Sequence, residues 1–103
     1  MIKNLSFIAL FDIYSGLLTE QQRRLFQMYY HQDLSLNEAA ELTGITKQAV
    51  RDSVKKSEAH LLKFEQALKI NEISSKVIDI CDRSMQNPIT EHIQEIKAII
   101  QTL

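Results

Sequence analysis

The sequence predicts an all-α protein, and three observations lead to this prediction. Two Gly and one Pro in 103 residues are too few for the many tight turns of an all-β chain. Apolar residues make up 45% of the chain and charged residues 24%, which is a globular balance. Apolar side chains recur at spacings of three and four, the period of amphipathic helices. At this length we expect a single helical domain over residues 1–103.

The first third of the chain predicts two helices. The first, residues 4–15, is apolar on most of its surface, so we expect it to be covered on more than one side and to end at Gly16. The second begins after a capping box of Thr19 and Gln22 and stops near residues 31–33. The residues expected to point inward from this helix are Leu25, Phe26, Met28, Tyr29 and Tyr30.

Two more helices are predicted in the middle of the chain. A capping box of Ser35 and Glu38 opens a short helix, and Gly44 ends it in the position that tolerates a left-handed backbone. Its expected inward residues are Leu36, Ala39, Ala40 and Leu42. Thr46 caps a long helix that neither Gly nor Pro interrupts. Its expected inward residues are Val50, Val54, Leu61, Phe64 and Leu68, with Ser57 in the remaining slot.

The last third predicts two to three C-terminal helices. The long helix breaks within residues 70–75, and residues 73–86 form the next helix. Its expected inward residues are Ile73, Val77, Ile80 and Ser84. Asn87 and Pro88 stop this helix, and Thr90 caps the last one. The apolar seam of the last helix comprises Ile93, Ile96, Ile99, Ile100 and Leu103.

Residues 35–57 carry the mechanics of a helix-turn-helix, within a core that we place at residues 19–64. A small residue, Ala40, stands where two helices must cross closely, and Gly44 supplies the turn. Ile45 fills the corner between the helices, while Val50 and Val54 anchor the second helix to the first. The offsets of these residues between two caps are specific to this motif.

The second helix of the motif then presents a basic and amide-bearing face opposite its two valines. In a DNA major groove, Gln48 can pair with adenine and Arg51 with guanine, and Thr46, Lys47, Lys55 and Lys56 suit phosphates. Asp52 repels phosphate unless it accepts from a cytosine amine or pairs with Lys55 or Lys56. The alternative is a solvated polar face without a ligand. The candidate DNA-binding residues are Thr46, Lys47, Gln48, Arg51, Asp52, Lys55 and Lys56.

The charge distribution favours a polyanionic partner for this face. The net charge is −1, yet residues 46–63 sum to +3, while residues 1–45 and 64–103 each sum to −2. The positive charge is therefore concentrated on the predicted second helix of the motif.

Other classes of function find little support. The single Cys81 excludes an internal disulfide and a cysteine-based metal site, and indicates a reducing cytoplasm. His31, His60 and His92 lack metal-ligand spacing. Asp12 interrupts the apolar start of the chain, so we expect neither a signal peptide nor a membrane span. No phosphate-binding Gly loop or nucleophile elbow is present, so we expect no enzyme, cofactor or metal.

Three stretches carry a resemblance to a known family: LLTEQQ at residues 17–22, YYHQDLSL at residues 29–36 and TKQAVRD at residues 46–52. They resemble the YlxM-type family of helix-turn-helix proteins and, more distantly, region 4 of bacterial sigma factors, which reads a promoter element. The YlxM-type resemblance covers essentially the whole chain and is most specific over residues 17–64. It implies a sigma region 4-like helix-turn-helix with an added N-terminal helix and two to three C-terminal helices.

The resemblance also implies a bacterial cytoplasmic protein that is linked to the signal recognition particle pathway, as a regulator. The family commonly has a serine at the cap of the second motif helix and an aromatic residue after the Ala-Val pair. Thr46 and Arg51 stand at these positions here. The cap chemistry is therefore preserved, but a base preference of the family does not carry over.

Two functions follow as hypotheses. The first is a DNA-binding regulator of transcription that uses residues 46–56 on double-stranded DNA. The second is a protein-interaction module that contacts the signal recognition particle protein or its RNA, with the motif kept as scaffold. In both we expect a homodimer, because the first helix is apolar all round and residues 65–103 carry an apolar seam. Leu62, on the polar side of its helix, adds a further apolar residue that needs a neighbour.

Overall fold

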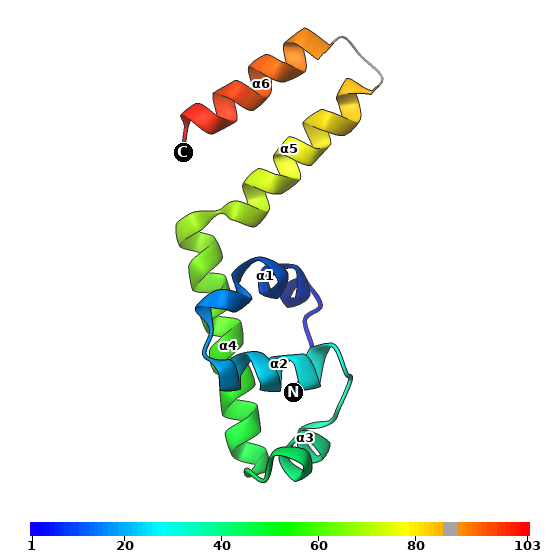
Figure 1. Cartoon of the computed structure of the whole chain (residues 1–103), viewed down its shortest axis with the longest axis vertical. Helices are drawn as coiled ribbons and strands as arrows, with labels where there is room; N and C mark the ends of the chain where they lie inside the picture. Colours follow the sequence, from blue (N-terminus) through cyan, green and yellow to red (C-terminus); the bar gives the residue numbers. More distant parts are fainter. Residues whose placement is uncertain (86–88) are drawn as a thin grey trace. The chain divides into compact units, whose positions relative to one another are not determined.

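The structure is a computed structural model that describes residues 1–85 and 89–103. Within these ranges it is helical and holds no strand, so the all-α prediction is confirmed (Figure 1). The elements are α1 (Ser6–Tyr14), the short 3-10 turn η1 (Ser15–Leu17), α2 (Glu20–Tyr30), α3 (Leu36–Thr43), α4 (Lys47–Leu68), α5 (Ile70–Ser84) and α6 (Ile89–Gln101). The chain divides into two compact units, Met1–Leu68 and Lys69–Leu103. None of the helices in the described ranges combines the length and the apolar character needed to cross a bilayer.

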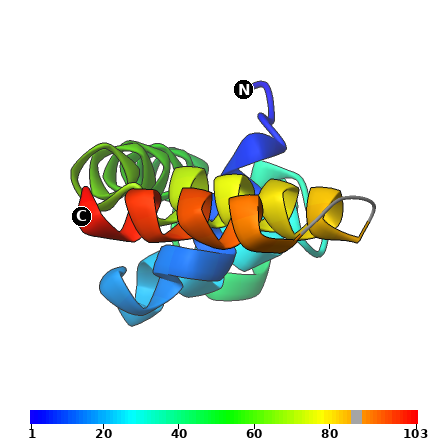
Figure 2. The ribbon, with the colours of Figure 1, turned by 90° about the horizontal axis from the view of Figure 1, so that it is seen from above.

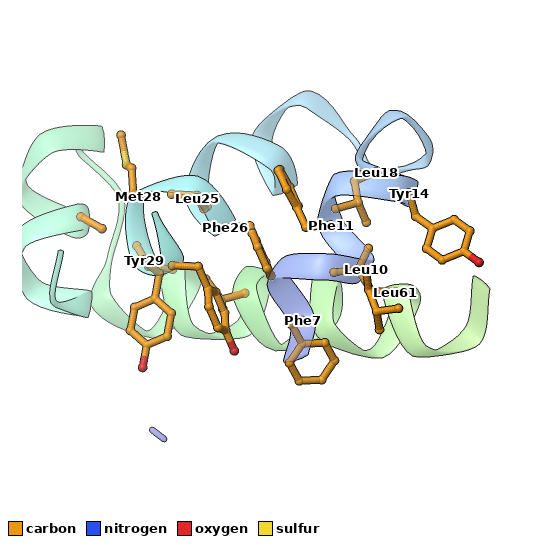
Figure 3. Packing of buried hydrophobic residues seen from close by; sticks show 14 residues of the cluster. Phe7, Leu10, Phe11, Tyr14, Leu18, Leu25, Phe26, Met28, Tyr29 and Leu61 are labelled. Carbon is orange, nitrogen blue, oxygen red and sulfur yellow. The ribbon is translucent and has the colours of Figure 1, made fainter. Parts of the chain in front are cut away.

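The N-terminal unit is built around α4, against which α1, α2 and α3 all pack. Val50, Val54 and Leu61 form a fully buried strip along this helix, and Ser57 occupies the slot between them. Ser57 is accommodated because its hydroxyl donates to the Ser53 carbonyl, at 2.9 Å. Figure 3 shows the side chains of α1 and α2 gathered along α4. The predicted inward spacing of this helix is confirmed over these four positions.

Aromatic side chains join α1 to α2. The rings of Phe11 and Phe26 stack with 4.4 Å between their centroids, and Phe26 stacks in turn on Tyr30 at the same distance. Only one face of α1 takes part in this packing, with Phe7, Leu10, Phe11 and Tyr14 buried. Leu5 and Ile13 stay exposed. Within the N-terminal unit α1 is therefore covered on one side, and the covering of a second side, for which a second copy of the chain is the expected source, stays a prediction.

The local signals for helix ends are largely confirmed. Thr19 with Gln22 and Ser35 with Glu38 form capping boxes in which both reciprocal hydrogen bonds are present. Thr46 accepts a hydrogen bond from the Ala49 amide, at 3.1 Å. The first helix is shorter than predicted: α1 ends at Tyr14, and the next three residues form the turn η1.

Two predicted inward positions, Leu42 and Leu68, are wrong. Ala39 is fully buried, as predicted, and Ala40 is partly buried and packs against the core. Leu42 leaves 64% of its surface exposed and Leu68 leaves 49%. The reason is geometric: α3 has only eight residues and packs on α4 and α2 from one side, so the opposite side of the helix faces solvent. Leu68 is the last residue of α4, and the last buried residue of that helix is Leu61.

Part-buried hydrogen bonds and one exposed ion pair connect the N-terminal residues to α2, to α4 and to the loop after α2. The Tyr30 hydroxyl donates to the Glu58 carboxylate and accepts from the Asn4 amide, at 3.3 Å. Tyr29 donates to the Met1 carbonyl, at 3.1 Å, and Lys3 pairs with Asp33. Burial, with the hydrogen bond to Glu58, holds the pKa of the Tyr30 phenol above its ordinary value.

The C-terminal unit is a pair of helices, α5 and α6, that lie side by side (Figures 1 and 2). Lys69, with φ of 55°, separates α4 from α5, so the break lies one residue before the predicted range of 70–75. Ile80 is buried on α5, as predicted, and Ile73, Val77 and Ser84 are half-buried.

The last helix departs from its prediction in two ways. Its first residue is Ile89, so Thr90 lies inside α6 instead of capping it, and the predicted stop at Asn87 and Pro88 falls outside the described residues. The inner face of α6 consists of buried His92 with half-buried Ile96 and Ile99. The remaining residues of the predicted seam, Ile93, Ile100 and Leu103, are exposed.

Gly44 supplies the left-handed backbone of the turn, with φ of 74° and no neighbouring atom within 4 Å of an added Cβ. We expect Gly44→Ala to lower the free energy of unfolding by about 1–2 kcal/mol, because an L side chain is strained at this φ. Urea denaturation measures the effect. Gly16→Ala is the matched control, since Gly16 also has open space around it but no positive φ. Equal losses in the two variants would contradict this account of the turn.

The raised pKa of Tyr30 predicts that the protein loses stability at alkaline pH. Because its pKa is raised in the folded state, the unfolded chain loses the phenolic proton first as pH rises through the ordinary value of 10.0. The contribution of the protonated Tyr30 phenol to the free energy of unfolding is complete below that pH. Above it, this contribution declines by about 1.4 kcal/mol per pH unit. Urea midpoints between about pH 9 and about pH 12 measure this slope. Tyr30→Phe is less stable at neutral pH but shows a shallower alkaline decline, and parallel declines would refute the assignment.

Candidate nucleic-acid interface

The turn between α3 and α4 has the backbone geometry of a helix-turn-helix. The Gly44 amide donates to the Ala40 carbonyl, at 2.9 Å, and the Thr43 hydroxyl donates to the Ala39 carbonyl, at 2.7 Å. Ile45 is half-buried against the core, as expected for the residue at the corner. Carbonyl groups in the last turn of α3 thus accept hydrogen bonds from residues of the motif itself, and α4 starts directly after the turn.

The two buried valines fix the rotation of α4 about its own axis. Val50 and Val54 have no exposed surface, so the side of α4 that carries them faces the core. Side chains on the opposite side must face solvent, because successive residues turn by about 100°. The fold therefore determines which side chains α4 offers to a partner.

All seven candidate residues lie exposed on the first half of α4 or at its cap. Their positions follow from the helix that carries them, and the structure brings them together as one surface, which we call the α4 face: Thr46, Lys47, Gln48, Arg51, Asp52, Lys55 and Lys56. Within the described residues, its four basic side chains form no ion pair. Their charges are therefore available to a partner.

Asp52 is engaged by a residue that the sequence reasoning did not pair with it. The Gln48 amide nitrogen donates to the Asp52 carboxylate, at 2.8 Å, one helical turn away. The predicted pairing with Lys55 or Lys56 does not occur in the part of the chain that the structure describes. The spacing of four residues between an amide and a carboxylate was the signal that could have found this bond.

A shallow depression beside the α4 face carries both signs of charge. Its lining is Met1, Lys3, Tyr29, Asp33, Leu34, Ser35, Leu36, Asn37, Glu38 and Lys47. The hydrogen bond and the charge of Lys3 lower the pKa of Asp33, and the backbone amide of Ser35 lowers the pKa of Glu38. Both carboxylates are ionised at neutral pH, so this depression is a poor site for an anion and the α4 face remains the basic surface.

The three histidines and Cys81 have different local surroundings. His31 packs beside Phe11, and His60 packs beside Phe64. His92 is buried on α6, and Cys81 on α5 is exposed. No group of three or more His, Cys, Asp and Glu side chains that could hold a metal ion occurs in residues 1–85 and 89–103.

Comparison with known proteins connects this architecture to a family. Residues 1–101 match the family described as "Putative helix-turn-helix protein, YlxM / p13 like". A UPF0122 protein of Ureaplasma parvum is 42% identical over 89 residues, which cover 86% of this chain and 90% of that protein. A UPF0122 protein of Thermoanaerobacter is 36% identical over 91% of this chain and 90% of its own. One of Halalkalibacterium halodurans is 35% identical over 98% and 94%. The chain belongs to the YlxM / p13-like family of helix-turn-helix proteins.

Proposed function

We propose that this protein is a DNA-binding regulator that lays α4 in the major groove of double-stranded DNA. The observation that carries the proposal is the α4 face: four basic side chains, without an ion pair to any residue that the structure describes, and one amide, directly after the turn of a helix-turn-helix. A groove of about 12 Å admits an α-helix, and the end of the helix nearest the turn reaches the bases. As part of this proposal, the protein is located in the cytoplasm, where bacterial DNA is found.

Within this proposal, some residues of the α4 face contact the phosphates of the DNA and others contact its bases. Lys47, Lys55 and Lys56, with the Thr46 hydroxyl, contact phosphates, which position the helix without reading sequence. Arg51 presents two parallel N–H groups to guanine, and Gln48 presents its amide to adenine. The overall charge of −1 does not oppose binding, because residues 46–63 sum to +3 and screening at cellular salt confines electrostatic effects to about 8 Å.

Fluorescence anisotropy on a labelled duplex of about 20 base pairs tests the proposal across about 50–200 mM salt. We expect affinity to fall linearly with salt on a double-logarithmic plot, since each phosphate contact releases counterions. Lys47→Ala shrinks the slope by about one, and Arg51→Ala lowers affinity at the preferred sequence by about tenfold.

Lys97→Ala is the matched control for this experiment. It removes the same charge as Lys47→Ala but from an exposed position on α6, so we expect the slope to stay unchanged. Duplex binding that is insensitive to both Lys47→Ala and Arg51→Ala would overturn the α4 face as the contact surface. An absence of binding at the lowest salt would overturn the function.

We also propose that the protein acts as a homodimer, so that two copies of α4 reach half-sites about 34 Å apart. The exposed side chains of Ile93 and Ile100 on α6, and of Leu103 after its end, support this proposal, because they leave apolar surface for a second copy. Exposed Ile13 on α1, with Leu5 at its N-cap, offers further apolar surface.

Light scattering at micromolar concentration measures the oligomeric state directly. We expect twice the chain mass of 11.9 kDa, and a shift toward the monomer in Ile93→Lys. Gln94→Lys introduces the same charge at a neighbouring exposed position of α6 and keeps the dimer. A monomeric mass for the unsubstituted protein would refute dimerisation.

The second candidate function is contact with the signal recognition particle protein or its RNA. The near-neutral net charge and the exposed apolar residues of the C-terminal unit, among them Ile78 on α5 and Met85 at its C-cap, favour a protein partner. Retention of these particle components by the immobilised chain, without salt-dependent duplex binding, would favour this function over the first. Duplex binding through the α4 face without such retention would exclude it.

A further inference from the structure

We infer that Asp52 is a positioning residue that orients the Gln48 amide to read adenine, a role that depends on the proposed use of α4 in the major groove. The sequence alone presents Asp52 as a charge that opposes phosphate. The 2.8 Å hydrogen bond from the Gln48 amide nitrogen gives the same carboxylate a local task.

The chemistry of the two groups determines which end of the amide Asp52 holds. An ionised carboxylate can only accept hydrogen bonds, so it binds the NH₂ end of Gln48 and rejects the carbonyl end. Since both residues lie on the exposed side of α4, one turn apart, the bond can form before any partner arrives. The free rotation of an exposed glutamine side chain is thereby reduced.

The bond leaves one acceptor and one donor on the Gln48 amide, namely Oε1 and the second N–H. Adenine offers the complementary pair in the major groove, the N6 amine as donor and N7 as acceptor. Guanine offers two acceptors, N7 and O6. An unrestrained glutamine can turn both of its N–H groups to guanine, whereas Gln48 held by Asp52 has only one to give. Asp52 therefore favours adenine over guanine at the base that Gln48 meets.

The negative charge of Asp52 has a second consequence for binding. It lies among Lys47, Arg51, Lys55 and Lys56 on the α4 face and weakens their combined attraction to phosphates. Removal of the charge should strengthen sequence-independent binding while adenine preference falls. Opposite changes in affinity and discrimination are the signature of a positioning residue, because a merely structural residue lowers both.

The experiment begins with selection from duplexes that carry a randomised segment of about 20 base pairs, by the full-length protein. Affinities are then measured for the preferred duplex and for duplexes in which each adenine of the selected site is replaced by guanine. We expect the unsubstituted protein to prefer adenine at one position by about tenfold or more. Asp52→Ala reduces this preference toward onefold, and its affinity for an unrelated duplex rises.

Two further variants separate positioning from charge. Asp52→Asn removes the charge and places a donor beside the acceptor, so it can bind either end of the Gln48 amide and only part of the adenine preference remains. In the double variant Gln48→Ala/Asp52→Ala, the loss of preference equals that of Gln48→Ala alone, because Asp52 acts through Gln48. Urea denaturation of every variant checks that the fold is intact.

The outcomes distinguish failure of this role from failure of the proposed function. No duplex binding by the unsubstituted protein would overturn both. Binding without adenine preference at any position, or a preference that Asp52→Ala leaves unchanged, would overturn the role of Asp52 while DNA binding stands. Additive losses in the double variant would also overturn it, since they would make Asp52 an independent contact.

Discussion

Three helices of the N-terminal unit depend on one narrow strip of α4. Val50, Val54 and Leu61 are fully buried there. The hydroxyl of Ser57, in the same strip, donates a hydrogen bond to a backbone carbonyl of the same helix. Because every large group of the strip is apolar and the hydroxyl is satisfied, α1, α2 and α3 can pack on it without an unpaired polar atom. The strip sets the rotation of α4, and that rotation sets everything the helix shows to solvent.

The same helix therefore serves the core with one side and exposes the other, where we propose that DNA binds. Substitutions on the α4 face, such as Lys47→Ala, remove exposed atoms and leave the buried strip intact. A mixed face nevertheless has an internal conflict, since Asp52 reduces the attraction for a polyanion. Its hydrogen bond with Gln48 offers a reason for its presence, because discrimination between bases needs an oriented amide more than it needs one further positive charge.

How much the sequence could predict depends on the range of the interaction concerned. Capping boxes, the left-handed Gly44 and the spacing of Val50 and Val54 are local, so they were visible without the fold. The difference in burial between Ala39 and Ala40 was not, because both are apolar neighbours on α3 and only the packing of α2 and α4 decides which is covered completely. The break after α4 lies at Lys69, where neither Gly nor Pro marks the end of a helix in the sequence. The apolar pattern of α6 likewise gave no sign that His92 is buried.

The all-α class, the helix-turn-helix of residues 35–57 and the exposure of the seven candidate residues follow from local sequence, because caps, a glycine turn and apolar periodicity are properties of neighbouring residues. The covered sides of α1, α3 and α6 depend on the packing of distant segments, since two faces of similar apolar character differ only in what packs against them. The partner of Asp52 likewise depended on side-chain geometry on the folded helix, where Gln48 reaches its carboxylate from one turn away.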